Sequence, residues 1–291
     1  MRSTIGYDKT IAKVETAPLA APDGSVTRIT IAPSAVTDAL LSIGVKQGSV
    51  VMVHPDAIVA AQFPAMPAAG PDNEHRLDLL IEAIEVAIGS QGTLLIPTFS
   101  YSFTKEEPFD ICNTPSAVVM VSERFRTRSG VRRTLDPIFS FAVRGRLAQE
   151  LCTIPAKECF GAESVFAALH RWNAQIVDLG CSMSRGGTFV HYVETSHGVD
   201  YRYKKVFSGI VISPDGLASE CSVVYNVRDL TRRSDADLRR LQKRLADDGK
   251  LRTVEIGRSR IMAVTANDLF DTAWKMLDED PVSLIAEGAR L

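Results

Sequence analysis

The chain has 291 residues, of which 45% are hydrophobic and 23% charged, with a formal net charge of −2. These proportions are typical of a soluble globular protein with a hydrophobic core, and a charge so close to zero argues against nucleic acid as a partner. No apolar run approaches the roughly 18 residues of a membrane-spanning helix, and the N-terminus lacks the pattern of a secretory signal. We therefore expect a cytoplasmic protein that has neither a membrane nor a nucleic acid as a partner.

The first 30 residues differ in pattern from the rest of the chain. Apolar and polar residues alternate over 26–31, directly after the turn sequence Pro22-Asp23-Gly24. This pattern indicates a hairpin-like peripheral extension over residues 1–30, followed by a single domain over residues 31–291. Ser34 is expected to cap the first helix of that domain, which Gly44 would end.

The domain alternates apolar runs with helical patterns. Near-continuous apolar runs predict buried strands, and a Pro/Ala/Gly-rich stretch predicts a loop over 64–71. Alternating segments on either side of 213–216 predict a β-hairpin. Together these indicate an α/β fold: a three-layer α/β/α sandwich with a central mixed, largely parallel sheet and an appended C-terminal β-hairpin region. The expected strands are 49–54, 92–98, 138–143, 176–179, 206–212, 219–227 and two within 253–264; the expected helices are 34–43, 74–88, 118–128, 164–171, 235–247 and 266–277.

The segment 176–194 combines a short strand, a turn rich in Gly and Ser, and a helix that carries His191 and Glu194. Residues three apart lie on the same side of a helix, so the imidazole and the carboxylate should face one place. Ligands of open α/β sheets bind just beyond the carboxyl ends of strands, where this turn should lie, and a histidine there can accept a proton near neutral pH. Spacing alone leaves open a purely structural role for both residues.

Polar residues also follow three of the predicted strands, at 54–56, 98–100 and 182–184. Because these stretches each follow an apolar strand, we expect them to share a pocket, although each alone is compatible with ordinary turn chemistry. A metal site is not expected, because His191, Glu194 and His197 turn away from a single helix face and the five cysteines form no CxxC pair. The usual nucleotide-binding and serine hydrolase motifs are missing as well.

Seven motifs in order resemble the aminoglycoside 3-N-acetyltransferase family, an acetyl-CoA-dependent group distinct from the common GNAT acetyltransferases. The resemblance extends from about Pro33 to the C-terminus. The motifs lie at 44–54, 92–100, 113–116, 123–126, 136–145, 159–164 and 187–194.

The resemblance implies an acyltransferase in which acetyl-CoA donates an acyl group to a primary amine of an aminoglycoside or amino sugar, an activity that includes antibiotic resistance. His191 is then the catalytic base with Glu194 beside it, and the turn after Thr98 is a candidate for stabilising the oxyanion. The expected partners are this small-molecule amine and CoA, with no metal, and a homodimer is one open oligomeric state. The implied CoA-binding residues are His54, Asp56, Ala57, Thr98, Phe99 and Ser140, and the implied acceptor-binding residues are Ser100, Tyr101 and Tyr192.

One departure from the family pattern affects the expected cofactor site. The two serines that follow the first histidine in the family are Pro55 and Asp56 here. Losing two hydroxyls and one N–H while adding a carboxylate disfavours the usual pyrophosphate contacts, so either CoA lies differently or Asp56 meets a substrate amine. The open alternatives are a nucleotide-linked amino sugar or another natural-product amine as acceptor, a catalytically impaired CoA-binding relative, and a metal-dependent hydrolase.

Overall fold

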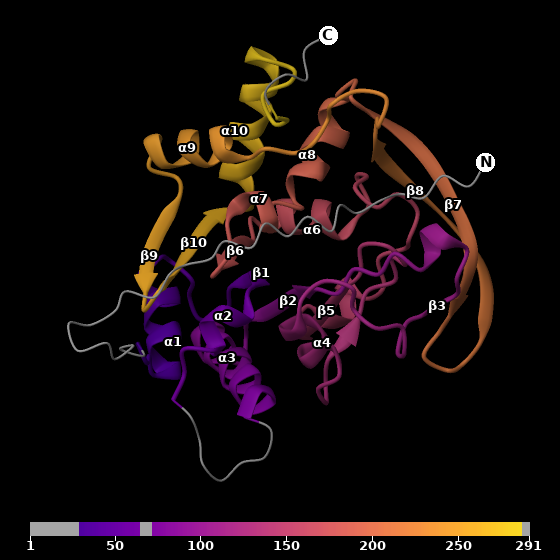
Figure 1. Cartoon of the computed structure of the whole chain (residues 1–291). Helices are drawn as coiled ribbons and strands as arrows, with labels where there is room; N and C mark the ends of the chain where they lie inside the picture. Colours follow the sequence, from indigo (N-terminus) through magenta and orange to yellow (C-terminus); the bar gives the residue numbers. More distant parts are fainter. Residues whose placement is uncertain (1–28, 65–71, 287–291) are drawn as a thin grey trace, which may run out of the picture.

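The computed structural model describes residues 29–64 and 72–286 (Figure 1). The expected N-terminal hairpin and the 64–71 loop therefore lie almost wholly outside the described residues. No helix in the described part of the chain is long and apolar enough to cross a membrane. The elements are α1 Pro33–Ser42, β1 Val50–Pro55, α2 Ala57–Ala60, α3 Asp72–Ile88, β2 Thr93–Pro97, η1 Phe103–Lys105, β3 Phe109–Asp110, α4 Met120–Arg126, β4 Arg132–Arg133, β5 Phe141–Gly145, α5 Ala148–Leu151, α6 Val165–Arg171, β6 Gln175–Leu179, α7 Met183–Gly186, α8 Val190–His197, β7 Arg202–Ile212, β8 Ala218–Arg228, α9 Arg239–Asp247, β9 Arg252–Ile256, β10 Ser259–Thr265 and α10 Ala266–Glu279.

The larger sheet has seven strands in the order β4-β5-β2-β1-β6-β10-β9. β1 lies at its centre and pairs in parallel with both β2 and β6. β5 and β10 are antiparallel to the strands on both sides of them, so the remaining five strands run in one direction. The mixed sheet expected from the sequence is confirmed, and its parallel pairings are confined to the three central strands.

Two hydrophobic clusters cover the two faces of this sheet. Val51 and Val53 of β1 belong to the cluster formed with α1, α3 and α4, whereas Met52 belongs to the cluster formed with α6, α8, α9 and α10. Successive strand residues point to opposite faces, which explains why alternate residues of β1 join different clusters. Figure 1 shows the first helix group below the sheet and the second above it, as the expected three layers require.

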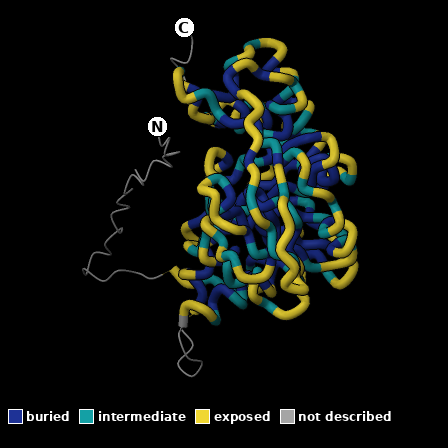
Figure 2. The backbone as a smooth tube through the Cα atoms, turned by 90° about the vertical axis from the view of Figure 1, so that its right-hand side faces the viewer, coloured by how far each residue is buried: buried dark blue, intermediate teal, exposed yellow. Residues whose placement is uncertain are grey.

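β7 and β8 form a long antiparallel hairpin that lies outside the main sheet, with β3 paired along the outer part of β7. The hairpin predicted from the sequence is confirmed, and it begins earlier than expected, at Arg202. Much of its length is exposed to solvent (Figure 2). Its inner residues pack on the second cluster, so the hairpin joins the domain through one face only.

Three predicted boundaries are wrong for local reasons. Ala32, and not Ser34, precedes the first turn of α1, because Pro33 occupies the first helical position and no side chain caps the helix. β5 begins at Phe141 because the Asp136 carboxylate accepts the backbone N–H of Ile138 and holds a turn there. α9 starts only at Arg239, directly after a second such aspartate turn.

Candidate active site

His191 and Glu194, named the dyad below, lie in contact on α8. His191 Nδ1 is 2.7 Å from Glu194 Oε2. The Glu194 side chain is fully buried, whereas the His191 side chain keeps 22% of its surface exposed. The contact expected from their spacing is confirmed, and it leaves the imidazole reachable from solvent while the carboxylate is not.

Two residues that follow α8 complete the surroundings of Glu194. Arg202, the first residue of β7, places Nε 2.7 Å from Oε2 of Glu194. Tyr201 donates its hydroxyl to the other carboxylate oxygen at 2.9 Å. Sequence reasoning missed both residues, because neither has a spacing relation to the helix that would point to it.

The charges around the dyad set the protonation of both members. Burial by itself would raise the pKa of Glu194, but Arg202, His191 and Tyr201 outweigh it and hold that pKa below its usual range. Burial, and then the positive charge of Arg202, lower the pKa of His191 against the opposing pull of Glu194. The dyad is therefore a neutral imidazole beside an ionised carboxylate at neutral pH.

The position of Glu194 also determines which nitrogen of His191 is free. An unprotonated Nδ1 would repel a carboxylate oxygen 2.7 Å away, so Nδ1 carries the ring proton and directs it to Glu194. Arg202 Nη2, which can only donate, lies 2.9 Å from the same nitrogen; we assign the ring proton to the shorter contact with Glu194, to which Arg202 turns its Nε. Nε2 remains as the basic atom of the dyad.

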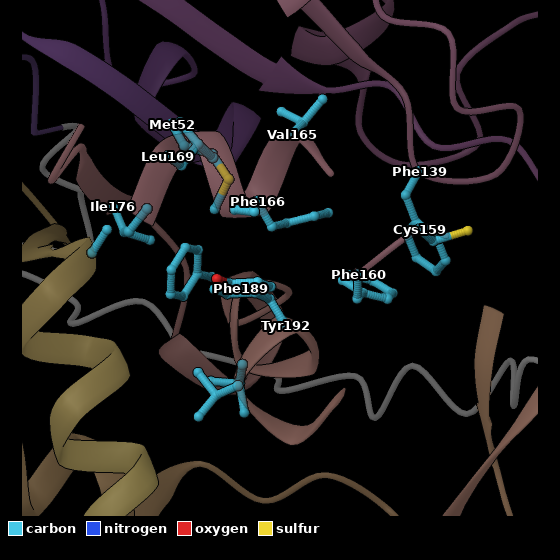
Figure 3. Packing of buried hydrophobic residues seen from close by; sticks show 14 of the residues in the cluster. Met52, Phe139, Cys159, Phe160, Val165, Phe166, Leu169, Ile176, Phe189 and Tyr192 are labelled. Carbon is cyan, nitrogen blue, oxygen red and sulfur yellow. The ribbon is translucent and has the colours of Figure 1, made fainter. Parts of the chain in front are cut away.

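Aromatic side chains surround the dyad on the inner side. Phe160 packs edge-on against the His191 ring, with 5.5 Å between centroids. It also packs at a tilt against Phe139, with 4.6 Å between centroids (Figure 3). Tyr192 was expected to bind the acceptor. Its ring instead packs between α6 and α10, and its hydroxyl lies 3.4 Å from His170 Nδ1. Adjacent helix residues point in different directions, so Tyr192 does not share the exposed side of His191.

His54 lies beside Asp178 on the same face of the central sheet. The pairing of β1 with β6 sets the two residues opposite each other, with 3.7 Å between His54 Nδ1 and Asp178 Oδ1. Burial raises the pKa of Asp178 to about 7 and lowers that of His54 to about 3, so near pH 7 His54 is neutral and Asp178 is protonated in about half of the molecules. Cys181 donates its thiol to the backbone oxygen of His54 at 3.3 Å, and burial raises its pKa well above the ordinary value. This thiol is therefore protonated and is not a ready nucleophile.

A sequence model of the family described as aminoglycoside 3-N-acetyltransferase matches residues 65–278. The chain belongs to the aminoglycoside 3-N-acetyltransferase family. It is 27% identical over 246 residues to aminoglycoside N(3)-acetyltransferase IV from Salmonella sp, a match that covers 84% of this chain and 86% of that one. The family is one of acyltransferases, and the resemblance noted in the sequence is thereby confirmed.

Solved structures of aminoglycoside acetyltransferases share the fold. The apoenzyme of AAC(3)-IVa superposes with a TM-score of 0.69 at 23% identity, covering 91% of this chain and 95% of that chain. AAC-IIIb, solved as a binary complex with CoASH, gives a TM-score of 0.72 at 18% identity over 86% and 97% of the two chains. The same fold is found in the YokD protein from Bacillus subtilis, with a TM-score of 0.69 at 15% identity over 87% and 95% of the two chains.

Asp56, which departs from the family pattern, is bound at the start of α2. Its carboxylate accepts the backbone N–H of Ile58 at 3.0 Å and lies 3.2 Å from Arg185 Nη1. Ala57, the first residue of α2, follows it directly. A carboxylate therefore occupies the helix N-terminus at which the acetyltransferase pattern places hydroxyls, and Arg185 supplies the neighbouring positive charge.

Thr98 and Ser140 were expected to contact CoA, and both are fully buried. Their hydroxyls lie 3.2 Å apart, and Arg133 binds both residues: its Nε donates to Ser140 Oγ at 2.9 Å and its Nη2 to the Thr98 carbonyl at 2.6 Å. This burial corrects the expectation of direct contact, because these two side chains can act on a ligand only through Arg133.

The other residues expected to bind a ligand at the Thr98 turn also make contacts within the protein. Phe99 is buried edge-on against Phe139 and Phe141, and Ser100 donates its hydroxyl to the Pro137 carbonyl at 3.0 Å. The backbone N–H of Thr98 binds the Ser140 carbonyl and that of Ser100 binds the Ile138 carbonyl, so neither is free for an oxyanion. Tyr101 alone among these expected residues is half-buried and keeps exposed surface.

No group of three or more His, Cys, Asp or Glu side chains within residues 29–64 and 72–286 is arranged to hold a metal ion. The groups available for chemistry in this part of the chain are the dyad, the His54–Asp178 pair and the Asp56–Arg185 pair. The first is the one that combines a basic atom, partial exposure and a buried carboxylate.

Proposed function

We propose that this chain transfers an acetyl group from acetyl-CoA to a primary amine of an aminoglycoside or a related amino sugar, with His191 as the general base. The single observation that carries the proposal is the buried, ionised Glu194 that holds His191 with Nε2 free. Membership of the aminoglycoside 3-N-acetyltransferase family and the CoASH complex of AAC-IIIb support the acyl donor and the class of acceptor.

The proton transfer follows from the charges of the dyad. A protonated amine has no lone pair for attack on a thioester, so a base must remove its proton. Because the pKa of His191 is lowered, the imidazole is neutral and able to accept that proton at pH 7. Glu194 then lies 2.7 Å from the imidazolium that forms and stabilises its charge.

Acetyl-CoA supplies the activated acyl group, and the amine displaces the CoA thiol from it. The carbon–nitrogen bond forms as the carbon–sulfur bond breaks. The protonated amine loses two protons in all: one passes through His191 to the departing sulfur, and the other is released to solvent. No covalent acyl-enzyme is needed, in agreement with the protonated state of Cys181.

The carboxyl ends of β1 and β6 are the proposed place of the donor. Asp56 disfavours a pyrophosphate at the start of α2, whereas the Arg185 side chain is 67% exposed and within 3.2 Å of Asp56. We assign Arg185 as the partner of the donor phosphates, with His54 and Ala57 beside it. The donor thus binds next to this cation and not directly on the α2 N-terminus.

The proposal is tested by release of free thiol from acetyl-CoA in the presence of a panel of amines: aminoglycosides, free amino sugars and nucleotide-linked amino sugars. His191→Ala should lower turnover by about 10²- to 10⁴-fold, the usual contribution of a general base. Calorimetry should show unchanged acetyl-CoA binding. The matched control is His197→Ala, on the same helix but bound to Asp278 on α10, which should keep full turnover.

Unchanged turnover in the His191→Ala variant would exclude the proposed base. Absence of thiol release with every amine, together with intact acetyl-CoA binding, would indicate an impaired relative. Loss of activity on treatment with a chelator would instead favour a metal-dependent hydrolase.

A further inference from the structure

A cleft of about 740 Å³ lies at the edge of the main sheet, away from α8. It is bounded by the segment after β3, the end of α4, β4, α5 and the turn of the β7–β8 hairpin. It is named the arginine cleft here, and its lining includes Arg126, Arg132, Arg133, Gln149 and Pro214. None of its lining residues belongs to the dyad, to the His54–Asp178 pair or to the Asp56–Arg185 pair.

The charge of this lining is entirely positive. Three arginines line the cleft, and no aspartate or glutamate is among its lining residues. Arg126 Nη2 lies 2.6 Å from Oε1 of Glu123, a carboxylate that is not part of the lining. Arg132 contacts only the neutral side-chain oxygen of Gln149 among the described residues. Within the described residues, Arg132 and Arg133 thus have no carboxylate in ion-pair or hydrogen-bond contact.

Arg133 is the most unusual of the three, because it is buried and its hydrogen bonds go only to neutral acceptors, while the carboxylates of Glu123 and Asp110 act on it from a longer distance. The residue is 6% exposed, and its recorded hydrogen bonds go to the Ser140 hydroxyl and to the backbone oxygens of Thr98 and Thr114. These bonds use three of the five N–H groups of a guanidinium. Its charge also lies 4.7 Å from the centre of the Phe109 ring.

The neighbouring arginine adds to this imbalance. Burial, and next the repulsion from Arg126, lower the pKa of Arg133 to about 10, although the charges of Glu123 and Asp110 act in the opposite direction. A buried charge whose hydrogen bonds go only to neutral acceptors lowers stability unless nearby charges compensate it fully. An anion in the cleft would supply that compensation to Arg133 and Arg126 together.

We propose that the arginine cleft binds a phosphate or pyrophosphate group of a small molecule. Guanidinium groups bind phosphate oxygens through paired hydrogen bonds, and the exposed Arg132 and the buried Arg133 both contribute to the lining of the cleft. Two sources share this chemistry: a phosphate of the acyl donor, which would replace the assignment to Arg185 made above, and a separate phosphorylated metabolite. The inference does not depend on the role of His191.

Calorimetric titration of the full chain with inorganic pyrophosphate tests the site. Arg132→Gln removes an exposed charge at the cleft, and Gln149→Glu adds a carboxylate there without removing an arginine. Each should weaken binding by about tenfold, because the loss of one charge-assisted hydrogen bond corresponds to about that change in Kd. Arg260→Gln, on β10 near the opposite edge of the sheet, is the matched control and should bind as the unchanged chain does.

Competition with acetyl-CoA distinguishes the two sources. If acetyl-CoA displaces pyrophosphate and Arg132→Gln also weakens acetyl-CoA binding, the donor occupies the cleft. If pyrophosphate and acetyl-CoA bind together, a separate phosphorylated ligand occupies it, and either result supports the site. The inference is overturned if pyrophosphate binding does not saturate, if Arg132→Gln and Gln149→Glu leave it unchanged, or if only Arg185→Gln abolishes it.

Discussion

Arg202 and Glu194 form a buried ion pair, with 2.7 Å between Nε and Oε2 and with 3% and 0% of their side chains exposed. The pair joins the start of the hairpin to α8, two elements that sequence patterns treat separately. It also means that the imidazole of His191 faces a carboxylate whose charge is already balanced. The basicity of the dyad is therefore decided by the hairpin as well as by the helix.

Replacing Arg202 should affect both stability and the proton affinity of the dyad. Arg202→Gln leaves Glu194 as an uncompensated buried charge, and breaking such a pair costs about 3–5 kcal/mol of unfolding free energy. Without the cation, the pKa of His191 should rise, because Arg202 lowers it in the intact protein. The acid limb of the pH profile of turnover should then shift to higher pH. Arg202→Lys keeps the charge and should restore most of the original profile, whereas identical profiles in all three proteins would contradict the coupling.

The titration of His191 itself can be followed by NMR of the histidine side chains. Burial and Arg202 lower its pKa, so the ring should titrate below 6.5. The signal is identified as the one missing from the spectrum of the His191→Ala variant. A base with this behaviour stays active at lower pH than an unperturbed imidazole would, and it loses activity once the imidazole is protonated. A pKa above 6.5 would show instead that the attraction of Glu194 for the imidazolium outweighs burial and the charge of Arg202.

Asp178→Asn should change how stability depends on pH. The pKa of Asp178 is raised to about 7 in the folded chain, so the proton that it holds stabilises the fold at low pH, and this stability is lost as the pH rises from about 4 to about 7. Asparagine does not ionise, so the variant does not lose this stability. The unfolding free energy of the variant minus that of the unchanged chain should therefore be more positive at pH 8 than at pH 5. His54, with its lowered pKa, acts in the opposite sense as the pH falls and is present in both proteins.

Urea unfolding at pH 5 and pH 8 measures this difference. Asp247→Asn, on the exposed side of α9, is the matched control and should alter stability equally at the two pH values. A constant difference between Asp178→Asn and the unchanged chain would contradict the protonated state of Asp178.

Gly186 covers the His54–Asp178 pair without leaving room for a side chain. A Cβ at this position would overlap Asp178 Oδ1 and lie 2.8 Å from its Cγ. Gly186→Ala should therefore lower the unfolding free energy by about 1–3 kcal/mol, as overpacking does. Because the severe overlap is with Asp178, and His54 Cβ at 3.1 Å is a milder contact, the double variant with Asp178→Ala should lose less than the sum of the two single changes. If the two losses of unfolding free energy were additive, the strain caused by Gly186→Ala would not come from the contact with Asp178.

Local patterns of the sequence were sufficient for most of the fold. Continuous apolar runs predicted β1, β2 and β6, and alternation of apolar and polar residues predicted β7 and β8. Both patterns can be recognised within a short stretch of sequence. The His191–Glu194 contact is of the same kind, because it spans one turn of one helix. The ordered motifs of the family supplied the chemistry that such periods do not contain.

Contacts between distant elements were decided only by the tertiary structure. Arg202 forms an ion pair with Glu194 because the hairpin begins next to α8. Asp178 lies opposite His54 because β1 and β6 pair in parallel. The buried hydroxyl of Ser140 accepts a hydrogen bond from Arg133. No local window records these contacts, since each depends on packing that brings together separate stretches of chain and removes them from water. The sequence by itself determined which helix carries the dyad, and the packing determined its charge, its free nitrogen and which polar residues remain accessible.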